Sequence, residues 1–149
     1  MLAMHHDYRI FNPSRGYLCM NELDFGAPLK PAMLSVFESK VSPTTYRDII
    51  LEAKRFNGPE ALEAKIVDKL GGWEQVLELV AERKLTEKAK SGVLSVMKEE
   101  MYRDTIAALA GWDDQTAKES NVQGPARDKA KAQREARVAQ WKRDGKAKL

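Results

Sequence analysis

The side chain best suited to chemistry is the carboxylate of Glu22, in the run CMNELDFGAPL that begins at Cys19. Apolar neighbours at Met20, Leu23 and Phe25 would desolvate this carboxylate and favour its protonated form, so that it could take and return a proton. A second interpretation makes Glu22 an acid in the first turn of a helix, where the helix dipole and unpaired amides stabilise a negative charge. Spacing alone favours that structural interpretation.

Two short extended segments would position this run. Asp7–Phe11 and Tyr17–Met20 are predicted strands, and residues 12–16 between them have the composition of a turn. The second strand would deliver Asn21 and Glu22 to a junction between a strand and a helix. Sites in α/β folds collect at such junctions.

The rest of the chain is predicted to be mainly helical. Ser42 and Pro43 are typical of a helix start, with a hydroxyl N-cap followed by proline at the first helical position. Ile66–Asp68 is expected to be extended. Further helices are expected from Pro31 and over residues 60–65, 73–85 and 91–110. The last two are amphipathic and must bury their apolar faces against the body or another subunit.

Composition limits the class of protein. The chain has 149 residues, 43% hydrophobic and 32% charged, which fits one ordinary domain at most. No apolar run is long enough to span a membrane, and the start is no secretory signal. Cys19 is the only cysteine, so no intrachain disulfide can form and a reducing compartment fits. His5 and His6 lack further ligands at suitable spacing, so no metal site is expected.

Charge is concentrated at the end of the chain. Residues 124–149 hold nine Lys/Arg and three Asp/Glu, a net +6, which leaves −3 for residues 1–123. We expect a solvated or partly disordered basic helix, and no nucleic-acid partner, because Trp141 is its only aromatic residue. Ala147, Lys148 and Leu149 match the small-basic-Leu form of the peroxisomal targeting tripeptide, which predicts a peroxisomal location. The alternative is a lysine-rich end without that role.

Two stretches carry a family resemblance. HDYRIFNPSRGYLCMNELDFGAPL and the later LEAKRFNGPEALEAKIVD resemble the enoyl-CoA hydratase/isomerase (crotonase) family over about residues 3 to 70. That family has an Asp-x-Arg-Ile strand, a second strand and then Glu-x-x-x-Gly-x-Pro. A later Glu-Ala helix leads into Ile/Val-Val-Asp. The pair Asn21 and Glu22 is closest to the Δ3,Δ2-enoyl-CoA isomerases of fungi and plants.

The resemblance implies an α/β fold that is the C-terminal half of a crotonase (ClpP/crotonase-like) fold, a few short strands followed by mostly helices. Residues 1–70 would form the core, residues 71–119 a helical region of the oligomerisation type, and residues 120–149 the basic tail. A homo-oligomer of the trimer type through the helical region is therefore expected.

The resemblance also implies the chemistry. Glu22 falls on the family's catalytic glutamate, and Asn21, Phe25 and Pro28 are expected to contact the substrate. That substrate would be a coenzyme A thioester, with no separate cofactor. The carboxylate would move a proton from C2 of a 3-enoyl-CoA to C4, in fatty acid β-oxidation, while two backbone amides stabilise the dienolate. Hydratases use a second glutamate where this chain has Met1, which favours isomerase over hydratase.

Two departures from the family pattern qualify these expectations. Lys65 stands where the family usually has a glycine that adopts a positive φ, at a cost of about 1 kcal/mol. The family's two oxyanion-hole amides come from segments ahead of Met1, so this chain by itself is expected to be inactive. The alternatives are a truncated, non-catalytic paralogue that acts through oligomer contacts, an enoyl-CoA hydratase, or an unrelated basic-tailed binding protein.

Overall fold

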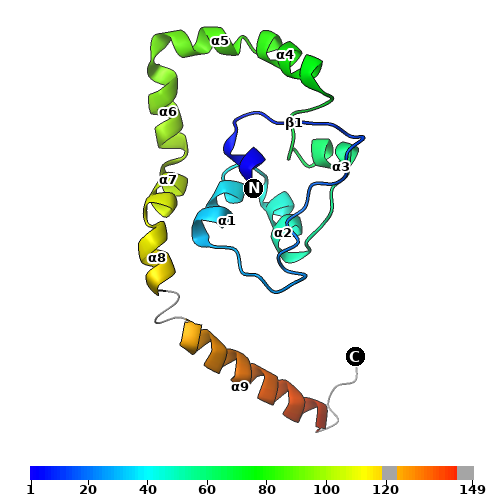
Figure 1. Ribbon diagram of the computed structural model, residues 1–149, viewed down its shortest axis with the longest axis vertical. Helices are drawn as coiled ribbons and strands as arrows, with labels where there is room; N and C mark the ends of the chain where they lie inside the picture. The colour runs from blue at the N-terminus through cyan, green and yellow to red at the C-terminus, as the bar shows by residue number, and fades with distance from the viewer. Residues whose placement is uncertain (119–123, 144–149) are drawn as a thin grey trace. The chain divides into compact units, whose positions relative to one another are not determined.

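Two short strands pair in parallel in the first part of the chain (Figure 1). In this computed structural model, which describes residues 1–118 and 124–143, β1 (Ile10–Phe11) pairs with β2 (Lys69–Leu70). Ile10 lies opposite Lys69, and Phe11 lies opposite Leu70. The backbone N–H of Asp68 donates to the carbonyl of Arg9 at 2.8 Å and extends the pairing by one residue.

The predicted strands are longer than the observed ones. Only Ile10 and Phe11 of the segment Asp7–Phe11 are in a strand, and Tyr17–Met20 is not a strand but carries a single antiparallel bridge between Leu18 and Phe56. Ile66–Asp68 precedes β2 rather than forming it. The observed strands are short because each pairs with one neighbouring strand over two residues.

Capping residues determine where the helices of this part of the chain begin. A 3₁₀ helix, η1 (Leu2–His5), precedes α1 (Pro31–Glu38), α2 (Pro43–Leu51) and α3 (Gly58–Glu63). The Ser42 hydroxyl caps α2 by accepting from the N–H of Thr45, as its position before Pro43 predicts. Asn57 and Glu60 form a reciprocal capping box at the start of α3. After α3 the chain turns through Lys65, whose φ of +57° is the left-handed conformation expected there.

The core is formed by apolar side chains from all of these elements. Phe56 and Val36 are its largest fully buried side chains. The other buried members come from η1, α1, α2, α3 and the loops between them: Met4, Met20, Phe37, Ile49, Ala61, Ile66 and Val67. Burial of this cluster is the main favourable term that holds the first 70 residues together.

The following helices are short and leave much apolar surface exposed. They are α4 (Trp73–Glu82), α5 (Leu85–Lys88), a 3₁₀ turn η2 (Ala89–Ser91), α6 (Val93–Met101) and α7 (Arg103–Ala110). The helix predicted over 91–110 is broken, because Tyr102 has the non-helical angles φ −109° and ψ 19°. Leu79 is buried, whereas Trp73, Leu77 and most apolar residues of α6 and α7 are exposed.

The chain divides into two units, Met1–Leu109 and Ala110–Leu149. The second contains α8 (Trp112–Lys118) and α9 (Gly124–Arg143). Every side chain described in α9 is exposed. No helix in the described ranges is long and apolar enough to cross a membrane. The predicted targeting residues Ala147, Lys148 and Leu149 lie outside the described residues.

Candidate active site

Glu22 lies in a turn, well ahead of the first residue of α1. The turn is closed by three backbone hydrogen bonds, of which the shortest runs from the N–H of Ala27 to the Glu22 carbonyl at 2.9 Å. Gly26 has a φ of +74°, which an L side chain rarely adopts. Glu22 is therefore not an acid in the first turn of a helix, and the structural alternative based on the helix dipole is wrong.

One oxygen of Glu22 is buried without a partner. The carboxylate atom Oε2 is inaccessible to solvent and makes no hydrogen bond. Across residues 1–118 and 124–143, no other side-chain polar atom is both buried and without a hydrogen-bond partner. Buried polar atoms are nearly always hydrogen-bonded, so each exception requires an explanation. A carboxylate oxygen with free lone pairs can accept a proton or a ligand's hydrogen-bond donor.

The neighbours of Glu22 only partly shield it. Met20 is buried, but the side chains of Leu23 and Phe25 are 57% and 66% exposed. The expectation that all three residues desolvate Glu22 is therefore wrong for two of them, because the turn directs Leu23 and Phe25 outward. Apolar side chains exposed this far are typical of a surface that contacts another molecule or segment.

The other predicted site residues lie close by in the chain. Asn21 is half-buried, and its carbonyl accepts from the N–H of Asp24 at 3.0 Å, so the structure brings Asn21, Glu22 and Phe25 together in one turn. Pro28 is exposed in the extended segment that leads to α1. No cluster of three His, Cys, Asp or Glu side chains within the described parts of the chain could hold a metal ion.

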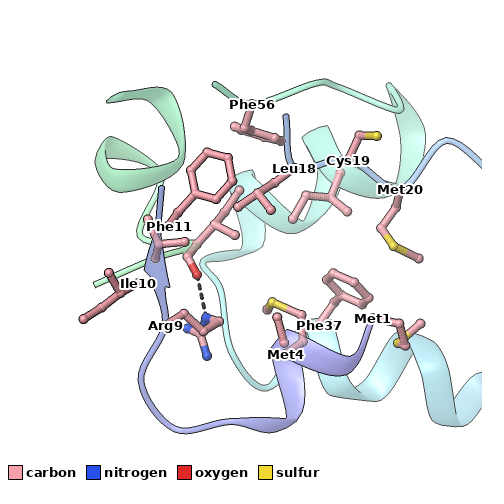
Figure 2. A pocket seen from close by; sticks show the side chains of 14 residues that line it. Met1, Met4, Arg9, Ile10, Phe11, Leu18, Cys19, Met20, Phe37 and Phe56 are labelled. Carbon is pink, nitrogen blue, oxygen red and sulfur yellow. Dashed lines mark hydrogen bonds between the residues drawn. The ribbon is translucent and has the colours of Figure 1, made fainter. Parts of the chain in front are cut away.

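An apolar cavity of about 150 Å³ is lined in part by Met20 (Figure 2). Its walls come from η1, β1, α1, α2 and the segment 18–20, and Glu22 does not line it. Arg9 is at its edge, but the Nε of this residue donates to the carbonyl of Ile66 at 2.6 Å and is thereby engaged. The cavity therefore offers apolar surface and sulfur atoms, including those of Met4, Cys19 and Met20.

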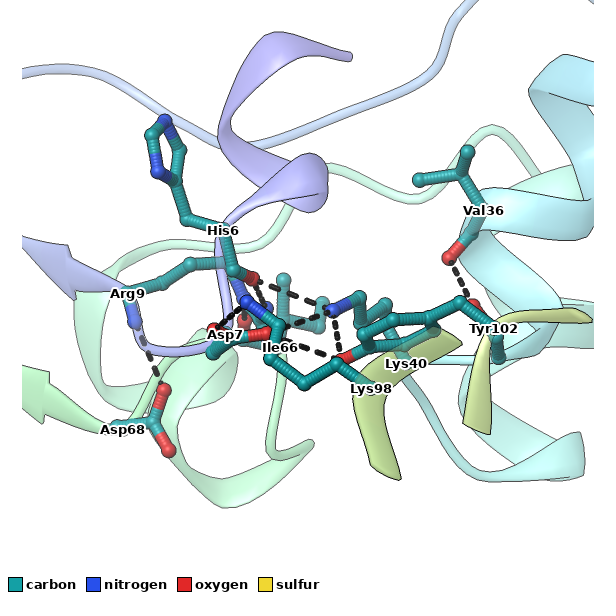
Figure 3. Close-up of polar contacts among 10 residues, drawn as sticks. His6, Asp7, Arg9, Val36, Lys40, Ile66, Asp68, Lys98 and Tyr102 are labelled. Carbon is teal, nitrogen blue, oxygen red and sulfur yellow. Dashed lines mark hydrogen bonds and ion pairs between the residues drawn. The ribbon is translucent and has the colours of Figure 1, made fainter. Parts of the chain in front are cut away.

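A partly exposed polar cluster joins α6 and Tyr102 to the N-terminal segment, and the sequence alone did not predict it (Figure 3). Lys98 donates to Asp7 at 2.6 Å, and the Tyr102 hydroxyl donates to the same carboxylate at 3.2 Å. The Lys40 ammonium, with a side chain only 7% exposed, lies 3.8 Å from Asp7 and donates to the Tyr102 hydroxyl. It also lies 3.9 Å from the centre of the Tyr102 ring.

The environment of this cluster shifts three pKa values. Burial would raise the pKa of Asp7, but the hydrogen bond and charge of Lys98, aided by Tyr102 and Lys40, hold it below its ordinary 3.8. Burial lowers the pKa of Lys40, with Asp7 opposing the shift. Burial and then the charge of Asp7 raise the pKa of Tyr102. In each case burial is the largest cause and a partner within the cluster is the next. The cluster joins α6 to the N-terminal segment and does not include Glu22.

Comparison with known proteins agrees with the resemblance seen in the sequence. No family model matches the chain. It is 36% identical over 69 residues to enoyl-CoA delta isomerase 3 of Arabidopsis thaliana, which covers 46% of this chain and 29% of that protein. It is 34% identical over 73 residues to the peroxisomal enoyl-CoA delta isomerase 1 of the same plant, covering 48% and 30%. The chain thus spans about a third of the length of these curated relatives.

Solved structures extend the similarity to the fold. The structure of an enoyl-CoA hydratase from Mycobacterium marinum matches with a TM-score of 0.64 at 24% identity, over 78% of this chain and 52% of that one. An enoyl-CoA hydratase/isomerase family protein from a Pseudomonas species matches with a TM-score of 0.63 at 19% identity, over 79% and 50%. The chain is therefore similar in sequence, over part of its length, to the enoyl-CoA hydratase/isomerase (crotonase) family, and it has a partial crotonase fold that is mostly helical with two short strands.

Proposed function

We propose that this chain carries the proton-transfer carboxylate of an enoyl-CoA isomerase, and that the carboxylate is Glu22. The observation that carries the proposal is the buried, unpartnered Oε2 of this residue. A buried carboxylate oxygen that makes no hydrogen bond has its lone pairs available for a proton of the substrate. The similarity to plant proteins named enoyl-CoA delta isomerase supports the substrate class.

In the proposed reaction Glu22 removes a proton from C2 of a 3-enoyl thioester. The electron pair of the broken C2–H bond forms a C1–C2 double bond while the carbonyl pair moves onto the thioester oxygen, which leaves a dienolate that retains its C3–C4 double bond. The protonated Glu22 then returns the proton to C4, and the double bond ends between C2 and C3. One carboxylate therefore suffices, and water is not consumed.

The remaining site residues have proposed roles in holding the substrate. Phe25 and Pro28 are exposed beside the turn, and Asn21 is half-buried next to Glu22, so all three can contact a bound thioester. The donors to the thioester oxygen are proposed, from the family resemblance, to lie outside this chain. We therefore propose that residues 1–149 do not catalyse the reaction alone, and the exposed Leu23 and Phe25 agree with a turn that another segment covers.

The names of two plant relatives support a proposal about location and metabolic role. Enoyl-CoA delta isomerase 1 and enoyl-CoA delta isomerase 2 of Arabidopsis thaliana are both named as peroxisomal. We propose that the protein acts in peroxisomal fatty acid β-oxidation, as a homo-oligomer of the trimer type through its helical region. The exposed apolar residues of α6 and α7 support an interface there.

The experiment that tests the catalytic proposal compares two isosteric changes in a protein brought to family length with the N-terminal part of a plant relative. Glu22→Gln removes the proton acceptor and is expected to lower the rate of 3-enoyl-CoA isomerisation by about 10² to 10⁴. Glu63→Gln makes the same chemical change at an exposed position of α3 and should leave the rate unchanged. A Glu22→Gln variant that keeps a tenth or more of the rate would exclude Glu22 as the base.

A further inference from the structure

The turn that carries Glu22 has the hydrogen-bond pattern of a helix C-terminus. The N–H of Ala27 donates to the carbonyl of Glu22 at 2.9 Å. Inside this bond, the N–H of Gly26 donates to the carbonyl of Leu23 at 3.3 Å. A bond that reaches back five residues around one that reaches back three is the Schellman motif, which ends many helices. In this chain residues 22–26 form the motif as a free-standing turn between β1 and α1.

Gly26 occupies the position of this motif that is left-handed. Its φ is +74°, a conformation that glycine adopts readily and that an L side chain disfavours. The penalty for a side chain is equivalent to a factor of about 5 to 30 in an equilibrium constant. A Cβ at this position would meet no heavy atom within 4 Å beyond its chain neighbours. An added methyl group would therefore oppose the turn through backbone conformation, without a clash.

Closure of the turn fixes the backbone of Glu22. Because the carbonyl of Glu22 accepts the bond from Ala27, the motif sets the peptide plane that follows Glu22. Side-chain packing adds little to this closure, since Leu23 and Phe25 are mainly exposed. Two such backbone hydrogen bonds favour the closed turn by a factor of about ten. The penalty of a side chain at Gly26 is of the same size, so it is sufficient to open the turn.

We propose that Gly26 is a positioning residue for Glu22, because its left-handed conformation closes the turn that directs the carboxylate. Gly26 has no side chain and acts only through the backbone of Glu22. Catalysis is sensitive to such placement, since an error of about 1 Å in a reacting group can lower a rate about a hundredfold. The role rests on the proposed function, in which Glu22 is the base. Closure of the turn, by contrast, can be measured without any reaction.

The first measurement is hydrogen exchange at the Ala27 amide of the 149-residue protein, followed by NMR. Gly26→Ala is expected to lower the protection of this amide about fivefold or more. Gly16→Ala is the matched control, because Gly16 has a φ of +73° and a Cβ there would also meet no heavy atom within 4 Å. The control should cost similar global stability and leave the protection of Ala27 unchanged.

The second measurement is kcat for 3-enoyl-CoA isomerisation by the family-length protein. In Gly26→Ala the ratio of closed to open turn should fall from about 10 to between about 2 and 0.3, which lowers the closed fraction, and with it kcat, about 1.5- to 4-fold. Gly26→Val should lower kcat further, since a β-branched residue is a greater outlier at positive φ. Gly26→Asn should retain more of kcat than Gly26→Ala, because asparagine tolerates the left-handed conformation. Gly16→Ala should leave kcat unchanged.

Three results would overturn the proposal. They are unchanged protection of Ala27 in Gly26→Ala, a kcat that does not fall in the order Gly26→Asn, Gly26→Ala, Gly26→Val, or an equal loss of kcat in Gly16→Ala. Glu22→Gln separates this proposal from the proposed function. If only the role of Gly26 is wrong, Glu22→Gln still lowers the rate by about 10² or more. If Glu22→Gln keeps the rate, the base is another group and the positioning role is wrong as well.

Discussion

Asp7 is the residue whose loss should loosen α6 from the N-terminal segment. Its carboxylate accepts from Lys98 at 2.6 Å and from Tyr102 at 3.2 Å, and it lies 3.8 Å from the Lys40 ammonium. Asp7→Asn removes the negative charge and keeps the size and one accepting oxygen. The two lysines would then face each other across a neutral amide, with Lys40 nearly buried.

The size of the effect follows from exposure. The Asp7 side chain is 38% exposed and Lys98 is exposed as well, so this pair resembles a surface salt bridge worth about 0.5 kcal/mol. Lys40 is only 7% exposed, and its ammonium lies 3.8 Å from Asp7, which is an ion pair and not a hydrogen bond, so this contact contributes about 1 kcal/mol more. The amide oxygen of asparagine would retain part of this contribution. We expect Asp7→Asn to lower the free energy of unfolding by about 1 to 2 kcal/mol after allowance for solvent screening.

The assay is urea unfolding, combined with amide hydrogen exchange resolved to single helices. Protection should fall in α6 more than in α2, because the cluster attaches α6 to the N-terminal segment. Glu78→Gln is the matched control, since Lys69 keeps its contact with Glu82 at 3.2 Å and the change should cost less than about 0.5 kcal/mol. A loss for Asp7→Asn no larger than that of Glu78→Gln would refute the role of the cluster.

The same cluster predicts a dependence on pH. The pKa of Asp7 in the folded protein is lowered from 3.8, so its ionised form is favoured by folding. Its contribution to stability is therefore complete above pH 3.8 and is lost as the pH falls through the lower, folded value. The difference in stability between wild type and Asp7→Asn should shrink in that acid range. A difference that stays constant from neutral pH to about pH 2 would contradict the assignment.

Further predictions concern local structure. Lys65→Gly should raise the free energy of unfolding by up to about 1 kcal/mol, because glycine adopts the observed φ of +57° without strain. A lower free energy of unfolding, measured in urea, would show that the packing of the lysine side chain stabilises the protein by more than the backbone strain costs. Asn57→Ala should lower the free energy of unfolding by about 1 kcal/mol, because the capping box at α3 is lost. Asn57→Asp should retain most of the wild-type stability. Equal stability of Asn57→Ala and wild type would show that Pro59 and tertiary packing suffice to start the helix.

The elements that could be predicted from sequence are those set by neighbours within a few residues. Ser42 predicts the start of α2 because its hydroxyl accepts from the amide of Thr45, three residues further along the chain. Strand lengths and the break at Tyr102 could not be predicted, because they depend on partners far along the chain. The residue types around Glu22 indicated a candidate site. The sequence alone could not show whether Glu22 lies in a turn or at the start of a helix.

The polar cluster illustrates what a linear sequence does not contain. Asp7 and Lys98 are 91 residues apart, and each is a common surface residue type. No spacing rule joins them, so only the tertiary structure brings the two charges into contact. The predicted site residues Asn21, Glu22 and Phe25 could be named because they lie within one short run.

The most direct test of the central claim is the fate of solvent oxygen in the reaction of the family-length protein with a 3-enoyl-CoA in water enriched in oxygen-18. A single carboxylate that shuttles a proton consumes no water, so the product should be the 2-enoyl-CoA without the heavy isotope, and Glu22→Gln should abolish its formation. A 3-hydroxyacyl-CoA that carries oxygen-18 would show water addition instead, and would contradict the assignment of Glu22 as the carboxylate of an isomerase.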